Sequence, residues 1–271
     1  MVKERLTTGK GLGDLAALPR ARGPGTSAPM EPVFDVTVTR DPDGVRQAQA
    51  LRHAVFVTEM GGASGGCDGL EADPFDAHCE HLLVCDPSRP DLGAVATLRL
   101  GYGQGGYYTE QEFDLAPLHA LGGSLAETGR TCLHPDYRGG AAAFVLFRAM
   151  LAQLQARNVA VLVGTASFPG RTIHRHMDAL RRLRQEALAP AAMRPKAQGP
   201  QAVAVEGDAP RSAMRTVPPL IKTYLRAGAW VGDGAWVDTG FNTVDVCMVL
   251  DMARVRVPRA AHRHLGGTLA T

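Results

Sequence analysis

Hydrophobic and polar residues recur with two different periods along the chain, and these periods predict the elements of the fold. Alternation or short apolar runs predict strands at 34–38, 81–85, 94–100, 125–133, 159–164 and 244–250. Apolar side chains at three- and four-residue steps predict helices at 45–60, 141–155, 172–188 and 220–226, the last opened by Pro219. This order, β-α-β-β-β-α-β-α-α-β, predicts an α/β fold in which helices cover the faces of a mixed sheet.

The segments between and around these elements have distinctive compositions. Residues 1–32 are rich in Gly, Pro, Ala and Thr, which predicts a flexible leader before a single domain at 33–251 and a basic tail at 252–271. The Gly-rich, acidic connection at 61–76 is too long for a simple linker, so we expect it to be functional or ordered by a ligand. The Pro/Ala/Gln-rich stretch at 190–210 fits a lid, a membrane-touching insertion or disorder, and the pattern does not separate these.

Composition excludes several classes of protein. Apolar residues make up 45% of the chain and charged residues 21%, as in globular domains, so wholesale disorder and fibrous structures are not expected. No apolar run approaches the roughly 18 residues of a membrane span, and no secretory signal is evident, so we expect a cytoplasmic protein. The five cysteines lack a spacing pattern and are interpreted as reduced thiols.

The net charge of +2 hides a strong asymmetry between two regions. Residues 59–92 carry eight acidic side chains against one base, Arg89. Residues 171–226 carry eleven bases against four acids. A cationic ligand near the first region and an anionic surface near the second are therefore plausible partners, although solvated charge is the alternative.

Two sequence patterns suggest chemistry that their context does not favour. Gly101, Gly103 and Gly106 spell G-x-G-x-x-G after a strand, but no helical pattern follows, so we do not expect a dinucleotide site. The His and Cys residues at 78, 79, 81 and 85 cannot all share one strand face, so a metal site there is not expected. Cys132 is interpreted as a buried structural thiol and not as a nucleophile, because no poised His partner is evident.

A small-residue turn at 134–144 carries the first positive signal. Backbone N–H groups at the start of an Ala-rich helix, with a guanidinium beside them, are typical of a phosphate site. The turn resembles the R/Q-x-x-G-x-G/A loop of the GNAT acyltransferases, which holds the pantetheine pyrophosphate of acyl-CoA. Ala141 replaces the first glycine of that loop, a change that suits a carrier-protein phosphopantetheine with its single phosphodiester. The predicted phosphopantetheine-binding residues are Arg138, Gly139, Gly140, Ala141 and Ala143.

Further motifs in matching order extend this resemblance to about residues 33–251. The set R-x-x-x-F at Arg52, D-x-x-D at 73–76, a strand Arg at 99 and E-x-x-R at 127–130 resembles the acyl-homoserine-lactone synthases. The longer strings at 125–138, 166–170, 218–233 and 238–247 are more similar to the ornithine–acyl-carrier-protein N-acyltransferases of ornithine lipid synthesis.

The resemblance implies a GNAT-like fold and one reaction. A (3-hydroxy)acyl chain would pass from the phosphopantetheine of acyl-carrier protein to the α-amine of L-ornithine, giving lyso-ornithine lipid, with no separate cofactor or metal. Such a reaction needs a base for the ammonium and donors for an oxyanion. Glu127 is the candidate base and Arg130 its partner, unless these two form only a structural ion pair. Strand N–H groups near Thr131–Leu133 are candidate oxyanion donors.

The remaining charged residues have two interpretations each. Asp73 and Asp76 match the cations of a dibasic amino acid, or they cap the loop as Asx-turns. Arg52 and Arg99 reach the substrate carboxylate or hold the acidic loop. The basic helix, with arginines at 175, 181, 182 and 184, suits docking of the acidic carrier protein or of the anionic inner membrane surface.

Three rival functions share part of this evidence. An acyltransferase for glutamine, lysine or another amino acid would carry the same motifs. An acyl-homoserine-lactone synthase would use S-adenosylmethionine, against which the stretch at 218–247 argues. A non-catalytic binding module would not need the complete set of charged residues. Nucleic-acid binding is not expected, because the basic run lacks interleaved aromatic residues and a recognition motif.

Overall fold

The computed structural model describes residues 33–63 and 68–256, all of which lie in one compact unit. The predicted leader at 1–32 and the tail beyond residue 256 lie outside the described residues. No helix of the described part is both long and apolar enough to cross a membrane.

The described strands form one large mixed sheet and a separate small pair. The large sheet contains β1 (Asp35–Thr39), β2 (Glu80–Cys85), β3 (Ala94–Gly101), β5 (Leu125–Leu133), β6 (Val161–Pro169), β8 (Ala202–Val203), β9 (Trp230–Val231), β10 (Ala235–Asp238) and β11 (Thr243–Asp251). Its order is β1-β2-β3-β5-β6-β11-β10-β8, with β9 beside β11. β4 (Phe113–Asp114) and β7 (Lys196–Ala197) form the second, antiparallel pair.

One junction in the large sheet differs from the other pairings between its named strands, which are antiparallel. β5 and β6 run parallel, and they pair only from Leu125 opposite Val161 to Glu127 opposite Val163. At the next residue Gly164 approaches the Thr128 backbone so closely that a Cβ would overlap the carbonyl oxygen of Thr128. Beyond this contact the two strands no longer pair, which leaves space between them in the centre of the sheet.

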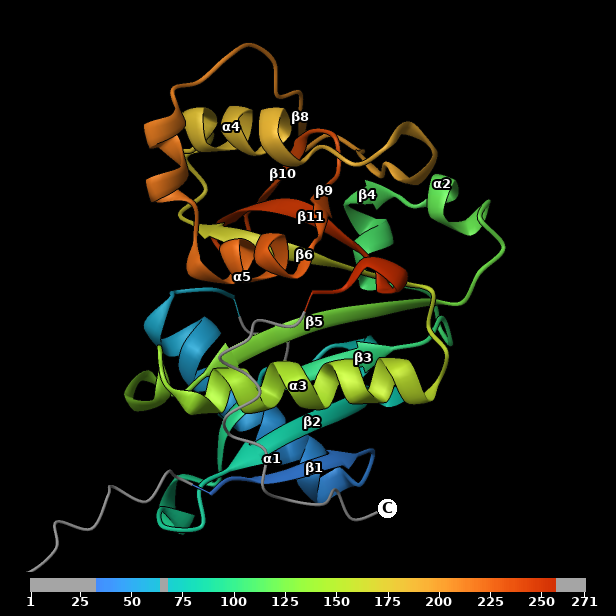
Figure 1. Ribbon diagram of the computed structural model, residues 1–271. Coiled ribbons are helices and arrows are strands. Elements are labelled where there is room, and N and C mark those ends of the chain that lie inside the picture. The colour runs from blue at the N-terminus through green and yellow to red at the C-terminus, as the bar shows by residue number, and fades with distance from the viewer. Residues whose placement is uncertain (1–32, 64–67, 257–271) are drawn as a thin grey trace, which may run out of the picture. The chain divides into compact units, whose positions relative to one another are not determined.

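Helices cover the sheet on both faces (Figure 1). The described helices are α1 (Pro42–Arg52), α2 (Ala116–His119), α3 (Ala141–Ala156), α4 (Met177–Ala187) and α5 (Pro219–Ala227). α3 packs on the face of β2 that presents Leu82 and Val84, whereas α1 packs on the opposite face, against Leu83. α5 contacts β6 and β11, so it lies beside the gap between β5 and β6.

Most predicted elements are confirmed, with shifts at their ends. The hairpin of β2 and β3 is antiparallel as expected, and β5 has the predicted limits. The predicted helix at 45–60 was wrong in detail, because α1 ends at Arg52 and continues as a π-helix, His53–Glu59. The stretch at 190–210 contains β7 and β8, and β10 follows it, so this region is built into the sheets. Short strands of two to four residues leave too little periodicity to detect.

The glycine pattern after β3 forms a turn and not a nucleotide loop. Gly103 and Gly106 have φ angles of +84° and +85°, which side chains with a Cβ rarely adopt. A 3₁₀ helix of four residues, Tyr108–Gln111, follows them. No long helix therefore begins at the third glycine, as the sequence predicted.

Candidate active site

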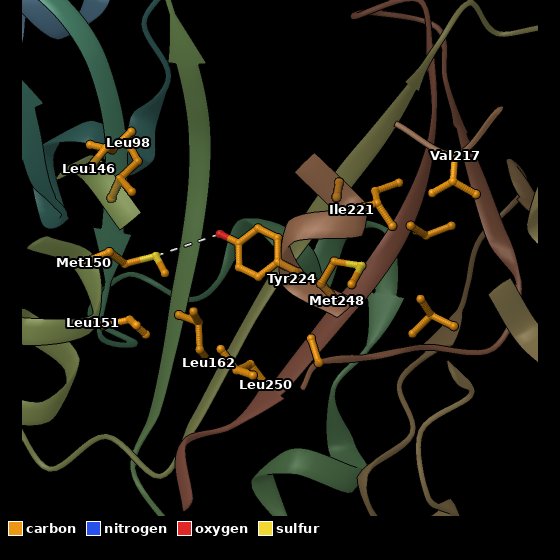
Figure 2. Packing of buried hydrophobic residues seen from close by; sticks show 14 of the residues in the cluster. Leu98, Leu146, Met150, Leu151, Leu162, Val217, Ile221, Tyr224, Met248 and Leu250 are labelled. Atoms are coloured by element: carbon orange, nitrogen blue, oxygen red, sulfur yellow. Dashed lines mark hydrogen bonds between the residues drawn. The ribbon is translucent and has the colours of Figure 1, made fainter. Parts of the chain in front are cut away.

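A cavity of about 1010 Å³ opens where β5 and β6 separate. Its walls come from the π-helix, α3, α5, β5, β6 and β11. The inner end is apolar, and Figure 2 shows Tyr224 of α5 pointing toward Met150 of α3, with its hydroxyl 3.8 Å from the sulfur. Apolar lining residues at this end include Leu98, Leu146, Phe147, Leu162, Met248 and Leu250. The shape and lining suit a long acyl chain.

The start of α3, which the sequence predicted to bind phosphate and which we call the cradle, lies at the cavity wall. Gly140 is the N-cap and provides no side chain to accept the first N–H groups of the helix. Gly139 has φ +73° and open space where a side chain would be. Gly139, Ala143 and Arg138 line the cavity. The first turn of α3, which includes Ala141, therefore offers free N–H groups and the positive end of a helix dipole.

Arg138 is already engaged by an acid from the π-helix. Its two terminal nitrogens each lie 2.6 Å from an oxygen of Glu59, and both side chains are exposed to about two fifths. The hydrogen bond from Arg138 lowers the pKa of Glu59. A phosphate at the cradle would therefore share or exchange this guanidinium with Glu59.

The free edge of β5 provides backbone donors toward the cavity. The N–H of His134 donates to the carbonyl of Val95 on β3, at 2.8 Å. Because N–H groups alternate along the regular part of a strand, that of Leu133 points away from β3, toward the side where β6 has separated. It belongs to the segment that the sequence proposed as the source of oxyanion donors.

Three arginines and three acids from distant segments form a buried group that we call the arginine network. Arg52 binds Glu71 and, at 2.9 Å, Asp76. Arg99 lies 2.5 Å from Asp73 and 2.6 Å from Asp76. Arg130 bonds Asp73 at 2.8 Å and Glu71 at 3.2 Å. Its members are Arg52, Glu71, Asp73, Asp76, Arg99 and Arg130, and Arg52 is only 1% exposed.

The arginine network attaches the acidic loop to the sheet. Asp73 also caps the 3₁₀ helix Pro74–His78, accepting the N–H of Phe75 at 2.9 Å. Burial alone would raise the pKa of Asp76, but hydrogen bonds and charge from Arg52, with Arg99 nearby, hold it below the ordinary value. All four oxygens of Asp73 and Asp76 have partners within the protein. The geometry thus supports loop anchoring by Arg52, Arg99, Asp73 and Asp76, while substrate binding by these four stays a prediction.

Arg130 joins this network to the cavity. It has φ +52° at a place where the β3–β5 register shifts, so the strand bulges there. Its guanidinium carbon lies 4.5 Å from the centre of the Tyr108 ring and 4.7 Å from that of Phe241. Arg130, Tyr108 and Phe241 all line the cavity.

Glu127 has different neighbours from those that the sequence suggested. Its carboxylate accepts the N–H of Tyr108 at 3.0 Å and that of Thr109 at 2.7 Å. No hydrogen bond or ion pair among the described residues joins it to Arg130, and it is not among the cavity-lining residues. Its contacts support a role in holding the 3₁₀ helix that carries Tyr108, and its role as a base stays a prediction.

A second group of buried acids lies beside Arg130, and we call it the carboxylate cluster. It consists of Glu112, Asp238 and Asp245, which each place one oxygen within 4.8 Å of the other two. Asp238 and Asp245 line the cavity. Burial, reinforced by the charge of Asp245, raises the pKa of Glu112 to about 9. Burial is also the main cause that raises the pKa of Asp245 to about 6.

Two of the thiols and imidazoles considered above lie next to this site, since Cys132 lines the cavity and the His81 ring lies 3.9 Å from Asp76. Cys132 is buried, and burial raises its pKa to about 12, which disfavours a reactive thiolate. The His and Cys residues at 78, 79, 81 and 85 do not converge. The one set of potential metal ligands found among the described residues is the carboxylate cluster.

The basic helix α4 keeps fewer free charges than its sequence suggests. Arg182 pairs with Glu186, and Arg184 lies 3.2 Å from Asp233. Arg181 donates to the carbonyl of Glu206 at 2.7 Å and also pairs with Asp178 at 3.4 Å.

Sequence reasoning missed several residues of this site. Glu71 lies in the acidic loop but outside the D-x-x-D motif at 73–76, so no role was assigned to it. Asp238 and Asp245 lie in the string 238–247, whose resemblance was noted without assigning a role to either acid. Glu112 belongs to no predicted element. Only the fold brings it to the other two acids, so no local signal was available.

Comparisons with known proteins agree with this fold. A family model described as an acetyltransferase (GNAT) domain matches residues 51–148. An N-acyl amino acid synthase from uncultured soil microbes has a similar structure, with a TM-score of 0.50 and 10% identity over 82% of this chain and 94% of that one. The predicted α/β, GNAT-like fold is thereby confirmed.

Two relatives found by sequence have a much higher identity to this chain than that structure has. An L-ornithine N(alpha)-acyltransferase of Rhodobacter capsulatus is 41% identical over 80% of this chain and 90% of its own length. One from Agrobacterium fabrum is 34% identical over 82% of each chain. These matches confirm the expected acyltransferase, and the chain belongs to the L-ornithine N(alpha)-acyltransferase family.

Proposed function

We propose that this enzyme transfers a (3-hydroxy)acyl chain from acyl-carrier protein to the α-amine of L-ornithine, forming lyso-ornithine lipid. The central observation is the cavity at the separation of β5 and β6, which combines an apolar inner end with a phosphate cradle. The names of the sequence relatives support ornithine as the acceptor.

The acyl donor would occupy the cavity from the cradle inward. N–H groups at the start of α3, with Arg138, would hold the phosphate of phosphopantetheine. The pantetheine arm would run between β5 and β6, and the acyl chain would lie against the apolar wall near Leu146 and Tyr224. The thioester carbonyl would then lie beside the free N–H group of Leu133.

The transfer itself would be direct. The neutral α-amine attacks the thioester carbon, and a tetrahedral intermediate forms whose oxyanion accepts hydrogen bonds from the β5 backbone. The C–S bond then breaks and the C–N bond remains. Overall, the amine nitrogen loses one proton and the departing sulfur gains one, so that a free thiol leaves. The proton acceptor is either Glu127 or solvent, and the pH dependence of Glu127 variants separates these two routes.

The product would be amphiphilic, so we place the reaction at the cytoplasmic face of the inner membrane. The basic helix α4 would contact either the acidic carrier protein or anionic lipid. Of the arginines at 175, 181, 182 and 184, Arg175, which lies just before α4, is the one for which no ion pair is found among the described residues.

Thiol release from 3-hydroxyacyl-carrier protein tests the proposal. Ornithine, lysine, glutamine and S-adenosylmethionine are supplied separately, products are identified by mass, and the acyl-CoA is run in parallel. Thiol release with ornithine, and a product of ornithine plus one hydroxyacyl unit, are expected. Release with another amino acid would move the acceptor, methylthioadenosine would indicate a lactone synthase, and no release in any arm would refute acyl transfer.

A further inference from the structure

The carboxylate cluster has no counter-charge of its own. Glu112, Asp238 and Asp245 are 1%, 6% and 4% exposed. Among the described residues, no Lys, Arg or His forms an ion pair with any of the three. Arg130 acts on Glu112 and Asp245 only through its electric field, since its hydrogen bonds go to Glu71 and Asp73. A buried group of acids without a cation is costly to maintain.

Unsatisfied hydrogen-bonding atoms around the cluster are a second, independent observation. Neither oxygen of Glu112 meets a donor in full hydrogen-bond geometry among the described residues, and Oδ1 of Asp245 does not either. The nearby hydroxyls only partly offset burial: that of Tyr108 lowers the pKa of Glu112, and those of Ser167 and Thr243 lower the pKa of Asp245. The hydroxyl of Thr243 also lacks a partner in full geometry, although this side chain is only 2% exposed and lines the cavity. Asp245 and Thr243 line the cavity and Glu112 lies behind them, so the incompletely satisfied acceptors of this cluster indicate a ligand that supplies further donors.

The geometry of the cluster matches a primary ammonium. Such a group has three N–H donors in tetrahedral directions and one positive charge. A nitrogen about 2.8 Å from each of three oxygens requires those oxygens to be about 4.6 Å apart. One oxygen from each member lies within 4.8 Å of the others, so the three can surround one ammonium.

The position of the cluster relates it to the acceptor. Arg130, which acts on the cluster, lies on β5 three residues before Leu133, whose N–H would bind the oxyanion. An amino acid whose α-amine is at this point of β5 directs its side chain away from the thioester. Asp238 and Asp245 share the cavity wall with Arg130, so they are within the space that this side chain would occupy.

Resting on the proposed function, we infer that Glu112, Asp238 and Asp245 bind the side-chain ammonium of the diamino acid acceptor and select it over neutral amino acids. The cluster also explains which amine reacts. Carboxylates stabilise the protonated form of the amine that they surround, and a protonated amine has no lone pair for attack. The side-chain amine is therefore protected while the α-amine is acylated.

Two isosteric variants, Glu112→Gln and Asp245→Asn, test this assignment. Ornithine is compared with glutamine, a neutral amino acid of similar length, at saturating 3-hydroxyacyl-carrier protein. Each variant is expected to raise KM for ornithine by about 10²-fold, because the ammonium loses a buried carboxyl partner, which in the case of Glu112 gives up its proton when the cation enters, and to leave KM for the acyl donor unchanged. The preference for ornithine over glutamine should shrink accordingly. Asp43→Asn, which removes an exposed carboxylate of α1, is the matched control.

Calorimetric titration of the same proteins with L-ornithine and L-norvaline, without acyl donor, gives a readout independent of turnover. Wild type should bind ornithine, and Glu112→Gln should not, while both retain a cooperative thermal transition. An unchanged ornithine-to-glutamine ratio in both variants would overturn the inference even if wild type acylates ornithine. Titration with Mg²⁺ or Mn²⁺ is the remaining arm. Metal binding that Glu112→Gln abolishes while ornithine binding persists would assign the cluster to a metal and overturn the inference.

Discussion

Two groups of three buried or largely buried acids lie near Arg130, and they differ in their counter-charges. In the arginine network, Glu71, Asp73 and Asp76 meet three arginines. In the carboxylate cluster, Glu112, Asp238 and Asp245 pair with none among the described residues. Burial and acidity are common to both groups. The number of cations within reach distinguishes acids that hold the fold from acids that are available to a ligand.

The two groups respond to burial in opposite ways. In the arginine network, Arg52 and Arg99 outweigh burial and hold the pKa of Asp76 below its ordinary value. In the carboxylate cluster burial prevails, helped by the neighbouring acids, and the pKa of Glu112 is raised. The first group is stable as it stands, whereas the second becomes favourable when a cation enters.

Removing one arginine should give the largest effect on stability. Arg52→Ala leaves the buried carboxylates of Glu71 and Asp76 without one of their positive partners, and such a loss typically costs about 3–5 kcal/mol. For a domain of this size the Tm should fall by about 6–20 °C. Urea unfolding measures the loss. Arg46→Ala removes an exposed arginine that pairs with Asp43 on the same helix, and it should change stability by less than about 0.5 kcal/mol. Equal stabilities of the two variants would refute a structural role for the network.

Glu127 sharpens the comparison, because this buried acid is satisfied by the backbone instead of by cations. Glu127→Ala leaves the N–H groups of Tyr108 and Thr109 without an acceptor, at about 1–3 kcal/mol each. We expect a loss of about 2–4 kcal/mol in unfolding and slower turnover, because Tyr108 contacts Arg130. Glu127→Gln keeps one acceptor and should fall between wild type and Glu127→Ala.

The pH profile of turnover then decides the role of Glu127. If Glu127 positions the 3₁₀ helix, kcat/KM for ornithine falls in the Glu127→Gln variant but keeps the shape of its pH dependence. A profile whose pH dependence disappears in that variant would instead identify Glu127 as the proton acceptor.

Removing an acid of the carboxylate cluster should change stability less than removing Arg52 does, and it should stabilise the protein. The folded protein keeps a proton on Glu112 from the ordinary pKa of 4.5 up to about 9, whereas the unfolded chain has lost it. Unfolding releases protons in this window, so the free energy of unfolding falls as pH rises through it. Glu112→Gln removes this dependence and should raise the Tm at pH 9 by about 4 °C. Thermal melts between pH 5 and 9 measure it, and a variant that is less stable than wild type at pH 9 would contradict the assignment.

Much of the fold was predictable because its long elements carry a clear period. β5 and α3 were located to within a residue, since each buries a regular apolar face over nine residues or more. The π-helix after Arg52 was not, because its apolar spacing matches that of an α-helix within one turn. The two-residue strands β7 and β8 are fixed by their partners and not by their own sequence.

The residues of the site were likewise predictable only where neighbouring residues in the chain formed a recognisable pattern. Arg138, Gly139 and Ala141 lie together in the chain, so their phosphate chemistry could be inferred from spacing alone. The roles of Asp73 and Asp76 depend on arginines that are 20 or more residues away, and sequence could not decide whether those arginines would neutralise them. Glu112 reaches the cluster only through tertiary contacts, more than 120 residues from Asp238.

The smallest expected effect concerns the exposed ion pair at the cradle. Variants of this pair test how the cavity binds the acyl donor. Glu59 holds Arg138 in the protein without ligand, so an incoming phosphate has to compete with a carboxylate for the same guanidinium. Exposed pairs of this kind are weak, and Glu59→Gln should therefore lower KM for acyl-carrier protein by only about two- to fivefold. Arg138→Ala should raise that KM, and neither variant should alter KM for ornithine. Steady-state kinetics at varied donor concentration measure both. If Glu59→Gln raises KM for the donor, Glu59 orients Arg138 for phosphate binding instead of competing with it.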